Sequence, residues 1–431
     1  MPDMFDSRTA GQRMALSREW EHLVGEVRAT PGFEEFLKPP ELADLLPAAE
    51  RGPVVIVNVS RWRCDALIVT SEGVSTCPLP GLTAEDAVAR TNVYLHTLQA
   101  AEWAAAARDL AREQLRDAPI MAHRQAVQAA ERVVRAADAA VEGMLLDLCR
   151  WMWQVIAEPI LDALDLPDCG GDPLPRLWWC STGALTLLPL HAAGYHDDPP
   201  PRRRTVLDRV VSSYTPTLRA LLAARQPLDR LVADDDRLLT VGVSEVVGQL
   251  PLPGVAAELA TLAELVPDRR TDLVDGAATR DEVLRALRTH RWAHFSCHGN
   301  QDLNDPAEGG LVLADGVLRI ADITSEQYHA EFAGLSACKT ATGGITLLDE
   351  AITLVSALHY TGYRHVIGTL WSVYDSPGTT GLFSSIYQDL ADGGRLHPER
   401  SAYALHRATI QLRDTEPRRP STWTPFIHVG P

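Results

Sequence analysis

Two short segments of the chain place a thiol and an imidazole where they could act together. His298 stands before Gly299 at the end of the apolar run 292–299, and Cys338 follows the apolar residues 335–337. Each run predicts a short buried strand with a reactive side chain at its end. A thiolate can attack a carbonyl carbon while an imidazole transfers the proton. The two residues are therefore candidates for the nucleophile and the general acid/base of a cysteine protease.

Strand alternation selects among the neighbouring histidines and cysteines. Side chains two residues apart share one face of a strand, so His294, Ser296 and His298 face one side and Cys297 faces the other. We expect His294, inside the strand, to be a buried histidine with a hydrogen-bond partner. A cysteine at a strand end is by itself more often a small core residue. The two residues taken together, in this order and setting, favour catalysis.

The elements that would position these residues alternate between strands and helices. Strands are expected at 238–243, before His298, before Cys338 and at 364–371, with a hairpin at 310–316. Helices are expected at 254–266, 279–290, 348–360, 377–391 and 398–412. This alternation predicts an α/β fold with a mostly parallel sheet and helices on both faces. Functional groups of such a sheet collect at the carboxyl ends of its strands, where both candidates stand.

The first part of the chain has a different pattern. Residues 1–50 predict an N-terminal helical segment, with helical spacing from 8 to 37. The apolar runs 54–59 and 63–69 predict a strand hairpin that starts a sheet. The run 177–190 predicts two further strands around a turn at Thr182-Gly183.

Two long stretches between these strands are rich in Ala and Leu. Residues 83–116 begin with Thr83-Ala-Glu-Asp86, which is typical of a helix start, and residues 122–157 follow after Pro119. They predict two long helices that pack as an antiparallel helical hairpin. The polar stretch from about 226 to 237 predicts the main boundary of the chain.

The composition excludes several classes of function. The formal net charge is −17 over 431 residues, and non-specific binding to nucleic acid needs clustered Lys and Arg. The seven cysteines include no Cys-x-x-Cys pair, and their odd number favours a reducing compartment. Neither Gly-x-Gly-x-x-Gly nor a P-loop is present, and neither a signal-peptide pattern nor a long apolar run occurs. We expect a cytoplasmic protein with no cofactor, no metal, no direct nucleic-acid partner and no membrane contact.

Four blocks of sequence, in this order, resemble the CHAT domain, a family grouped with the caspases, separases and gingipains. They are His-Phe-Ser-Cys-His-Gly (294–299), Leu-Ser-Ala-Cys-Lys-Thr (335–340), Gly-Thr-Leu-Trp-Ser-Val-Tyr-Asp (368–375) and Trp-Thr-Pro-Phe-Ile-His-Val-Gly (423–430). The segments 64–69 and 182–191 are also similar to the front half of CHAT proteins. The resemblance covers roughly residues 50 to 431.

The resemblance implies a caspase-like fold in two halves. A smaller caspase-like half without catalytic residues, a pseudo-protease, would occupy 51–230 and carry the helical hairpin within 83–157. The catalytic CHAT half would occupy 238–431. Residues 1–50 lie outside the resemblance.

The resemblance also implies roles for single residues. Cys338 would be the nucleophile and His298 the general acid/base. The backbone N–H groups of Gly299 and Cys338 would form the oxyanion hole. In related separases an Asp after the Leu-Trp strand helps to hold a basic residue before the cut bond, and Asp375 has that position here. This implies a preference for Arg or Lys as the residue before the cut bond.

The acidic residues near these blocks also fit purely structural roles. Asp375 could cap the helix that is expected near Pro377. For four further acidic candidates, a role as a turn residue, a helix cap or a solvated charge fits better than substrate binding; they are Asp302, Asp305, Asp349 and Glu350.

Three functions fit these residues. The first is an endopeptidase that cleaves a protein or peptide substrate. The second is a catalytically silent caspase-like scaffold or interaction module, and the third is an acyltransferase or another thiol hydrolase.

CHAT domains are commonly joined to tetratricopeptide repeats or sensor modules, so the resemblance implies bacterial signalling or defence and a regulatory protein partner. The N-terminal helices and the helical hairpin are the candidate surfaces for that partner.

Overall fold

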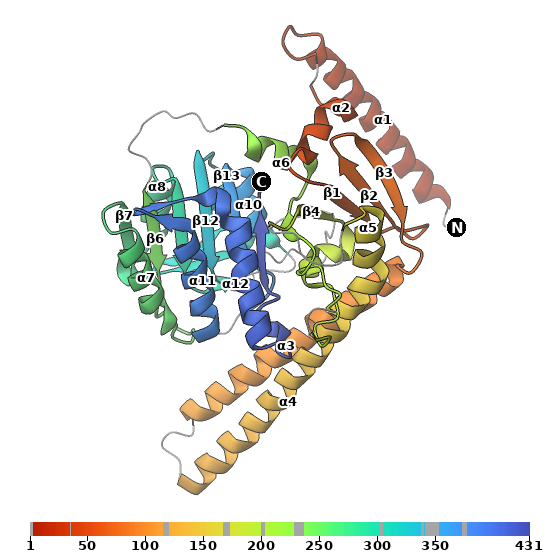
Figure 1. Ribbon diagram of the computed structural model, residues 1–431. Helices are drawn as coiled ribbons and strands as arrows, with labels where there is room; N and C mark the ends of the chain where they lie inside the picture. The colour runs from red at the N-terminus through yellow and green to blue at the C-terminus, as the bar shows by residue number, and fades with distance from the viewer. Residues whose placement is uncertain are drawn as a thin grey trace. The chain divides into compact units, whose positions relative to one another are not determined.

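The computed structural model describes most of the chain (Figure 1). The described residues are 3–34, 36–114, 120–166, 173–199, 203–227, 237–300, 305–337, 340, 353–372 and 377–431. They form two compact units, residues 1–47 and 48–431.

The first unit is helical, with α1 (Asp3–Arg28) and the short α2 (Leu42–Leu45). α1 ends at Arg28 and does not continue to residue 37 as expected. Two features explain the early end. The residue before Pro31 is disfavoured in a helix, and Gly32 has φ +90°. The guanidinium of Arg28 then donates to the carbonyl of Phe36 at 2.7 Å and closes the turn.

The second unit is built on one large sheet. Its strands are, in spatial order, β3 (Gly73–Pro78), β2 (Asp65–Thr70), β1 (Val54–Asn58), β4 (Arg176–Ser181), β5 (Val211–Tyr214), β16 (Phe426–Val429), β13 (Tyr363–Thr369), β12 (Ala330–Ser336), β8 (Trp292–Ser296), β6 (Leu238–Gly242) and β7 (Arg270–Val274). Neighbouring strands from β13 to β7 are all parallel, whereas β16 is antiparallel to β13 and parallel to β5. The expected mostly parallel sheet is confirmed.

Helices cover both faces of the parallel part of this sheet, as expected. On one face, α7 (Gly254–Leu265), α11 (Pro377–Leu390) and α12 (Ser401–Thr415) share a core with Trp292 and Phe332 (Figure 1). On the other face lie α8 (Arg280–Leu287), α9 (Ile320–Thr324) and α10 (Leu354–Tyr360). The residues expected to start α10, from 348 to 352, lie outside the described residues.

The front part of the second unit follows the predicted order. β1 and β2 pair as the antiparallel hairpin, and β1 also pairs in parallel with β4. Two long helices, α3 (Ala84–Gln114) and α4 (Ile120–Met152), pack against each other as the helical hairpin. The hydroxyl of Thr83 accepts from the backbone N–H of Asp86 at 3.0 Å and caps α3. A π-helical turn (Trp153–Ala157) and α5 (Glu158–Ala163) follow α4.

The prediction of a second strand after Gly183 is wrong. The chain forms 3-10 turns there, at Gly183–Leu187 and Leu190–Ala192. The side chain of Thr182 explains the difference, because it donates to the carbonyl of Val57 at 2.9 Å and accepts from the N–H of Val59 at 3.3 Å. The end of β4 is thus tied to β1, and the following leucines are buried in the core without entering a ladder.

Several small elements complete the second unit. β10 (Gly310–Leu313) and β11 (Gly316–Arg319) form the expected hairpin, and β9 (Gly299–Asn300) pairs with β10. The remaining elements are α6 (Leu218–Arg225), β14 (Ala391–Asp392) and β15 (Arg395–Leu396). Within the described ranges, no helix combines the length and the apolar character needed to cross a membrane.

Candidate active site

The candidate site lies at the carboxyl ends of three neighbouring parallel strands. In the register of β8 and β12, Ser296 is opposite Ser336. In the register of β12 and β13, Gly334 is opposite Ile367. His298 follows Ser296 by two residues. Cys338 itself lies outside the described residues, but Ala337 and Thr340 on either side of it are described.

His298 is held at both its backbone and its ring. Its carbonyl accepts from the N–H of Val312 at 2.8 Å, and its Nε2 donates to the carbonyl of Leu250 at 2.7 Å. A carbonyl oxygen can only accept, so the proton of the neutral ring is on Nε2. Nδ1 is then the ring nitrogen that can take a proton from a thiol. The side chain is partly exposed.

A buried polar cluster lies beneath His298 on the same face of β8. The hydroxyl of Ser296 donates to Glu258 Oε2 at 2.5 Å, and Nε2 of His294 lies 3.6 Å from the same oxygen. The other ring nitrogen of His294 is 2.9 Å from the hydroxyl of Tyr387. Burial raises the pKa of Tyr387 well above its usual value, and the nearby Glu258 adds to this rise. His294 is thus fully buried with a hydrogen-bond partner, as expected, and Cys297 lies in the core on the other face.

Thr369, at the end of β13, anchors the chain on both sides of Cys338. Its hydroxyl donates to the carbonyl of Ala337 at 2.7 Å, and its backbone N–H donates to the hydroxyl of Thr340 at 2.8 Å. Gly368 permits this approach, because a Cβ there would lie 2.6 Å from the Thr340 hydroxyl. The Gly-Thr pair therefore positions the segment that carries the cysteine.

The remaining predicted residues are only partly described. Gly299 lies opposite Leu311 in the pairing of β9 with β10 and is partly buried. Asp305 is exposed, and the other acidic candidates lie outside the described residues; they are Asp302, Asp349, Glu350 and Asp375.

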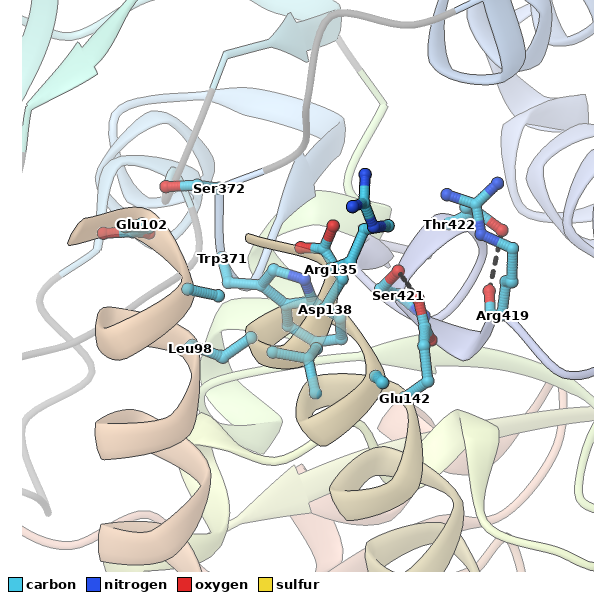
Figure 2. A pocket seen from close by; sticks show the side chains of 13 residues that line it. Leu98, Glu102, Arg135, Asp138, Glu142, Trp371, Ser372, Arg419, Ser421 and Thr422 are labelled. Carbon is cyan, nitrogen blue, oxygen red and sulfur yellow. Dashed lines mark hydrogen bonds between the residues drawn. The ribbon is translucent and has the colours of Figure 1, made fainter. Parts of the chain in front are cut away.

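A cavity of about 370 Å³ lies about halfway along the helical hairpin, between α3, α4 and the segment after β13 (Figure 2). We call it the hairpin cavity. It is lined by Leu98, Ala101, Glu102, Arg135, Asp138, Ala139, Val141, Glu142, Trp371, Ser372, Arg419, Ser421 and Thr422. Trp371 and Ser372 come two and three residues after the end of β13, so one wall of the cavity lies near the carboxyl end of this strand.

Other thiols in the described part of the chain are poor nucleophiles. Burial raises the pKa of Cys149 to about 12 and that of Cys180 to about 11. Burial also raises the pKa of Cys77, and Cys64 is buried. A thiol with a raised pKa stays protonated at neutral pH and does not attack carbonyl groups.

Sequence reasoning missed three residues at this site, namely Glu258, Leu250 and Thr369. Glu258 could have been found, because it interrupts the buried stripe of α7 between Val255 and Leu262. The carbonyl of Leu250 carries no sequence signal, because any residue supplies one.

The sheet order, the parallel carboxyl ends and the helices on both faces define a caspase-like α/β fold, which a solved separase shares. The CHAT domain model matches residues 146–431, which is more than half of the chain. The chain belongs to the CHAT domain family.

Solved structures align with this chain at low sequence identity. The Saccharomyces cerevisiae separase in complex with securin aligns with a TM-score of 0.56 and 10% identity, over 90% of this chain and 30% of the separase chain. A complex of the pro- and mature domains of Porphyromonas gingivalis RgpB aligns with a TM-score of 0.43 and 10% identity, over 67% of this chain and 76% of that chain. This chain therefore spans about a third of the separase chain that it matches. A search of curated protein sequences gave no significant match.

Proposed function

We propose that the chain is a cysteine endopeptidase in which Cys338 is the nucleophile and His298 the general acid/base. The observation that supports this most is the strand register at the site. Ser296 and Ser336 are paired, and His298 and Cys338 each follow by two residues. Neighbouring strands are about 4.8 Å apart, so we expect the residues that follow the two strand ends to bring these side chains within reach of each other.

The proposed reaction begins with proton transfer from the thiol of Cys338 to Nδ1 of His298. The thiolate attacks the peptide carbonyl, and the new oxyanion accepts hydrogen bonds from the N–H groups of Gly299 and Cys338. The imidazolium gives its proton to the leaving amine as the C–N bond breaks. Water, deprotonated by the imidazole, then attacks the thioester, and the thiol returns with its proton.

The buried cluster around Glu258 supports this assignment through position. Ser296 and His294 are fixed by Glu258 and Tyr387, so the strand that ends at His298 has little freedom to shift. Thr369 likewise restricts the segment around Cys338 through its hydrogen bonds to Ala337 and Thr340. Precise placement of reacting groups is a large part of enzymatic rate enhancement.

Specificity and regulation are further parts of the proposal. Asp375 would hold an Arg or Lys before the cut bond through a charged, paired hydrogen bond. A protein partner would control the activity. In its support, the separase with the same fold was solved in complex with securin. If the isolated chain were fully active, the requirement for a partner would be contradicted, and the protease proposal would stand.

The test is cleavage of a peptide library by the full chain, read by mass spectrometry. We expect cuts after Arg or Lys, and we expect Cys338→Ala to abolish them. Cys77→Ala is the matched control, because it removes a partly exposed thiol away from the site, and its cleavage should be unchanged. Undiminished cleavage by the Cys338→Ala protein would overturn the proposal. Loss of the Arg/Lys preference in Asp375→Asn would support the role of that residue.

A further inference from the structure

The hairpin cavity is lined by four segments of the chain, the fourth of which carries Arg419, Ser421 and Thr422 (Figure 2). Leu98 and Glu102 come from α3, Asp138 and Glu142 from α4, and Trp371 from the segment after β13. Its volume of about 370 Å³ is at the small end of ligand pockets, which hold roughly 300–1,000 Å³. This volume suits a single long side chain with part of its backbone.

The inner wall of the cavity is apolar and fixed in place. Trp371 is 4% exposed, and the ring of Tyr94 meets it edge-on with the ring centres 5.7 Å apart. Val141 and Ala101 are also buried beside it. A long aliphatic stem packs well on such a wall, and a cation over an indole ring is attracted by its π electrons.

The charges around the cavity favour a cation. Three carboxylates line it, those of Glu102, Asp138 and Glu142, against the guanidinium groups of Arg135 and Arg419. Arg419 is already paired with the nearby Glu416 at 3.2 Å, and Arg135 is exposed. The carboxylates therefore outnumber the cations, and the chain as a whole carries a formal charge of −17.

Glu142 is held in place by Ser421. It accepts hydrogen bonds from the hydroxyl and the backbone N–H of Ser421, at 2.5 and 3.1 Å. Burial raises its pKa despite these bonds and despite the nearby Arg419. A cation brought into the cavity would stabilise this partly desolvated carboxylate.

The position of the cavity relates it to the proposed active site. Trp371 follows Thr369 by two residues, and Thr369 bonds to Ala337 and Thr340 on either side of Cys338. The end of β13 therefore leads to the wall of the cavity and also anchors the segment that carries the proposed nucleophile.

We propose that the hairpin cavity binds an Arg or Lys side chain of the peptide substrate, other than the residue directly before the cut bond. This inference rests on the proposed function for the identity of the ligand as a substrate. The role is additional to the one proposed for Asp375, and it makes the helical hairpin part of substrate recognition. A substrate would then carry two basic residues at a fixed spacing.

Direct binding tests the cavity independently of catalysis. The full chain with Cys338→Ala is titrated into fluorescein-labelled nonapeptides that carry two arginines, with the spacing varied between peptides, and anisotropy is measured. The matched peptide has citrulline, which is neutral and nearly the same shape, in place of the arginine more distant from the cut bond. We expect the arginine peptide to bind at least about tenfold more tightly, with the difference reduced at high salt.

Variants that remove charge from the hairpin cavity or narrow it test whether the peptide binds there. Glu102→Gln with Asp138→Asn removes two charges of the cavity, and we expect it to remove the preference for arginine over citrulline. Glu113→Gln with Glu264→Gln removes two exposed charges elsewhere and should leave the preference unchanged. Ala139→Trp, on the exposed side of α4, narrows the cavity and should weaken binding without a change of charge. Thermal unfolding of each variant checks that it is folded.

The outcomes separate the two proposals. Equal binding of the arginine and citrulline peptides, or a preference that survives both cavity variants, would overturn the cavity proposal even if the wild type cleaves peptides. A preference that depends on the cavity, in a wild type that cleaves nothing, would keep the cavity as a binding site for basic side chains and overturn the protease function.

Discussion

Gly368→Ala should damage both the stability and the proposed catalysis of this chain. A Cβ at this position would lie 2.6 Å from the hydroxyl of Thr340 and still closer to a methyl group of Val355. Val355 is buried and β-branched, and Thr340 is bonded to Thr369, so neither neighbour can turn away freely. Overpacking of this kind costs about 1–3 kcal/mol of the free energy of unfolding.

The same substitution should displace the segment that carries Cys338, since Thr340 lies two residues after it. A misplacement of about 1 Å at a reacting group costs about 100-fold in rate. Urea unfolding measures the first effect, and the rate of peptide cleavage per folded molecule measures the second. Gly143→Ala is the matched control. It has no neighbour within 4 Å of the added Cβ and lies inside α4, so it should stabilise the helix by about 0.5–1 kcal/mol. A Gly368→Ala protein as stable and as active as the wild type would refute the role given to Thr369.

Two further predictions concern the stability of the fold. Burial lowers the pKa of four histidines to about 3 or 4; they are His191, His196, His359 and His406. Near and below pH 6.5 these histidines take up protons in the unfolded chain but not in the folded chain. The free energy of unfolding therefore decreases as the pH is lowered, by about 1.4 kcal/mol for each histidine from pH 7.5 to 5.5. A urea midpoint that is the same at both pH values would contradict this. Arg413, 2% exposed, donates two hydrogen bonds of 2.9 Å to Asp208, and Arg413→Ala should cost about 3–5 kcal/mol in urea unfolding because the carboxylate of Asp208 loses its counter-charge and is left with the hydroxyl of Thr205. Arg407→Ala breaks the exposed pair with Asp389 and should cost at most about 1 kcal/mol; equal losses in the two variants would contradict the role of burial.

Local periodicity predicts the elements that carry the candidate site. Alternation places Cys297 on the other face of the strand from His298, because the side-chain period of a strand is independent of its tertiary contacts. Position along the strand separates the two histidines, since His294 lies inside it and is buried, whereas His298 follows its end and is partly exposed. The helix start at Thr279 is also predicted, and the hydroxyl of Thr279 accepts from the N–H of Glu282 at 3.4 Å.

Long-range contacts could not be predicted in the same way. The strand expected after Gly183 is replaced by 3-10 turns because Thr182 bonds to β1, more than 120 residues earlier in the chain. The pairing of β16 with both β13 and β5, which joins the two parts of the sheet, likewise depends on partners far apart in sequence. The division into a pseudo-protease half at 51–230 and a catalytic half at 238–431 stays a prediction.

The pairing of Cys338 with His298 is most directly tested by covalent trapping. The full chain is treated with a peptidyl chloromethyl ketone that ends in arginine, and the site of modification is mapped by mass spectrometry. We expect a single adduct on Cys338 that forms in the wild type and in Cys77→Ala, and that fails to form in His298→Ala. An adduct on another cysteine, or equal modification of Cys338 with and without His298, would contradict the assignment of this pair.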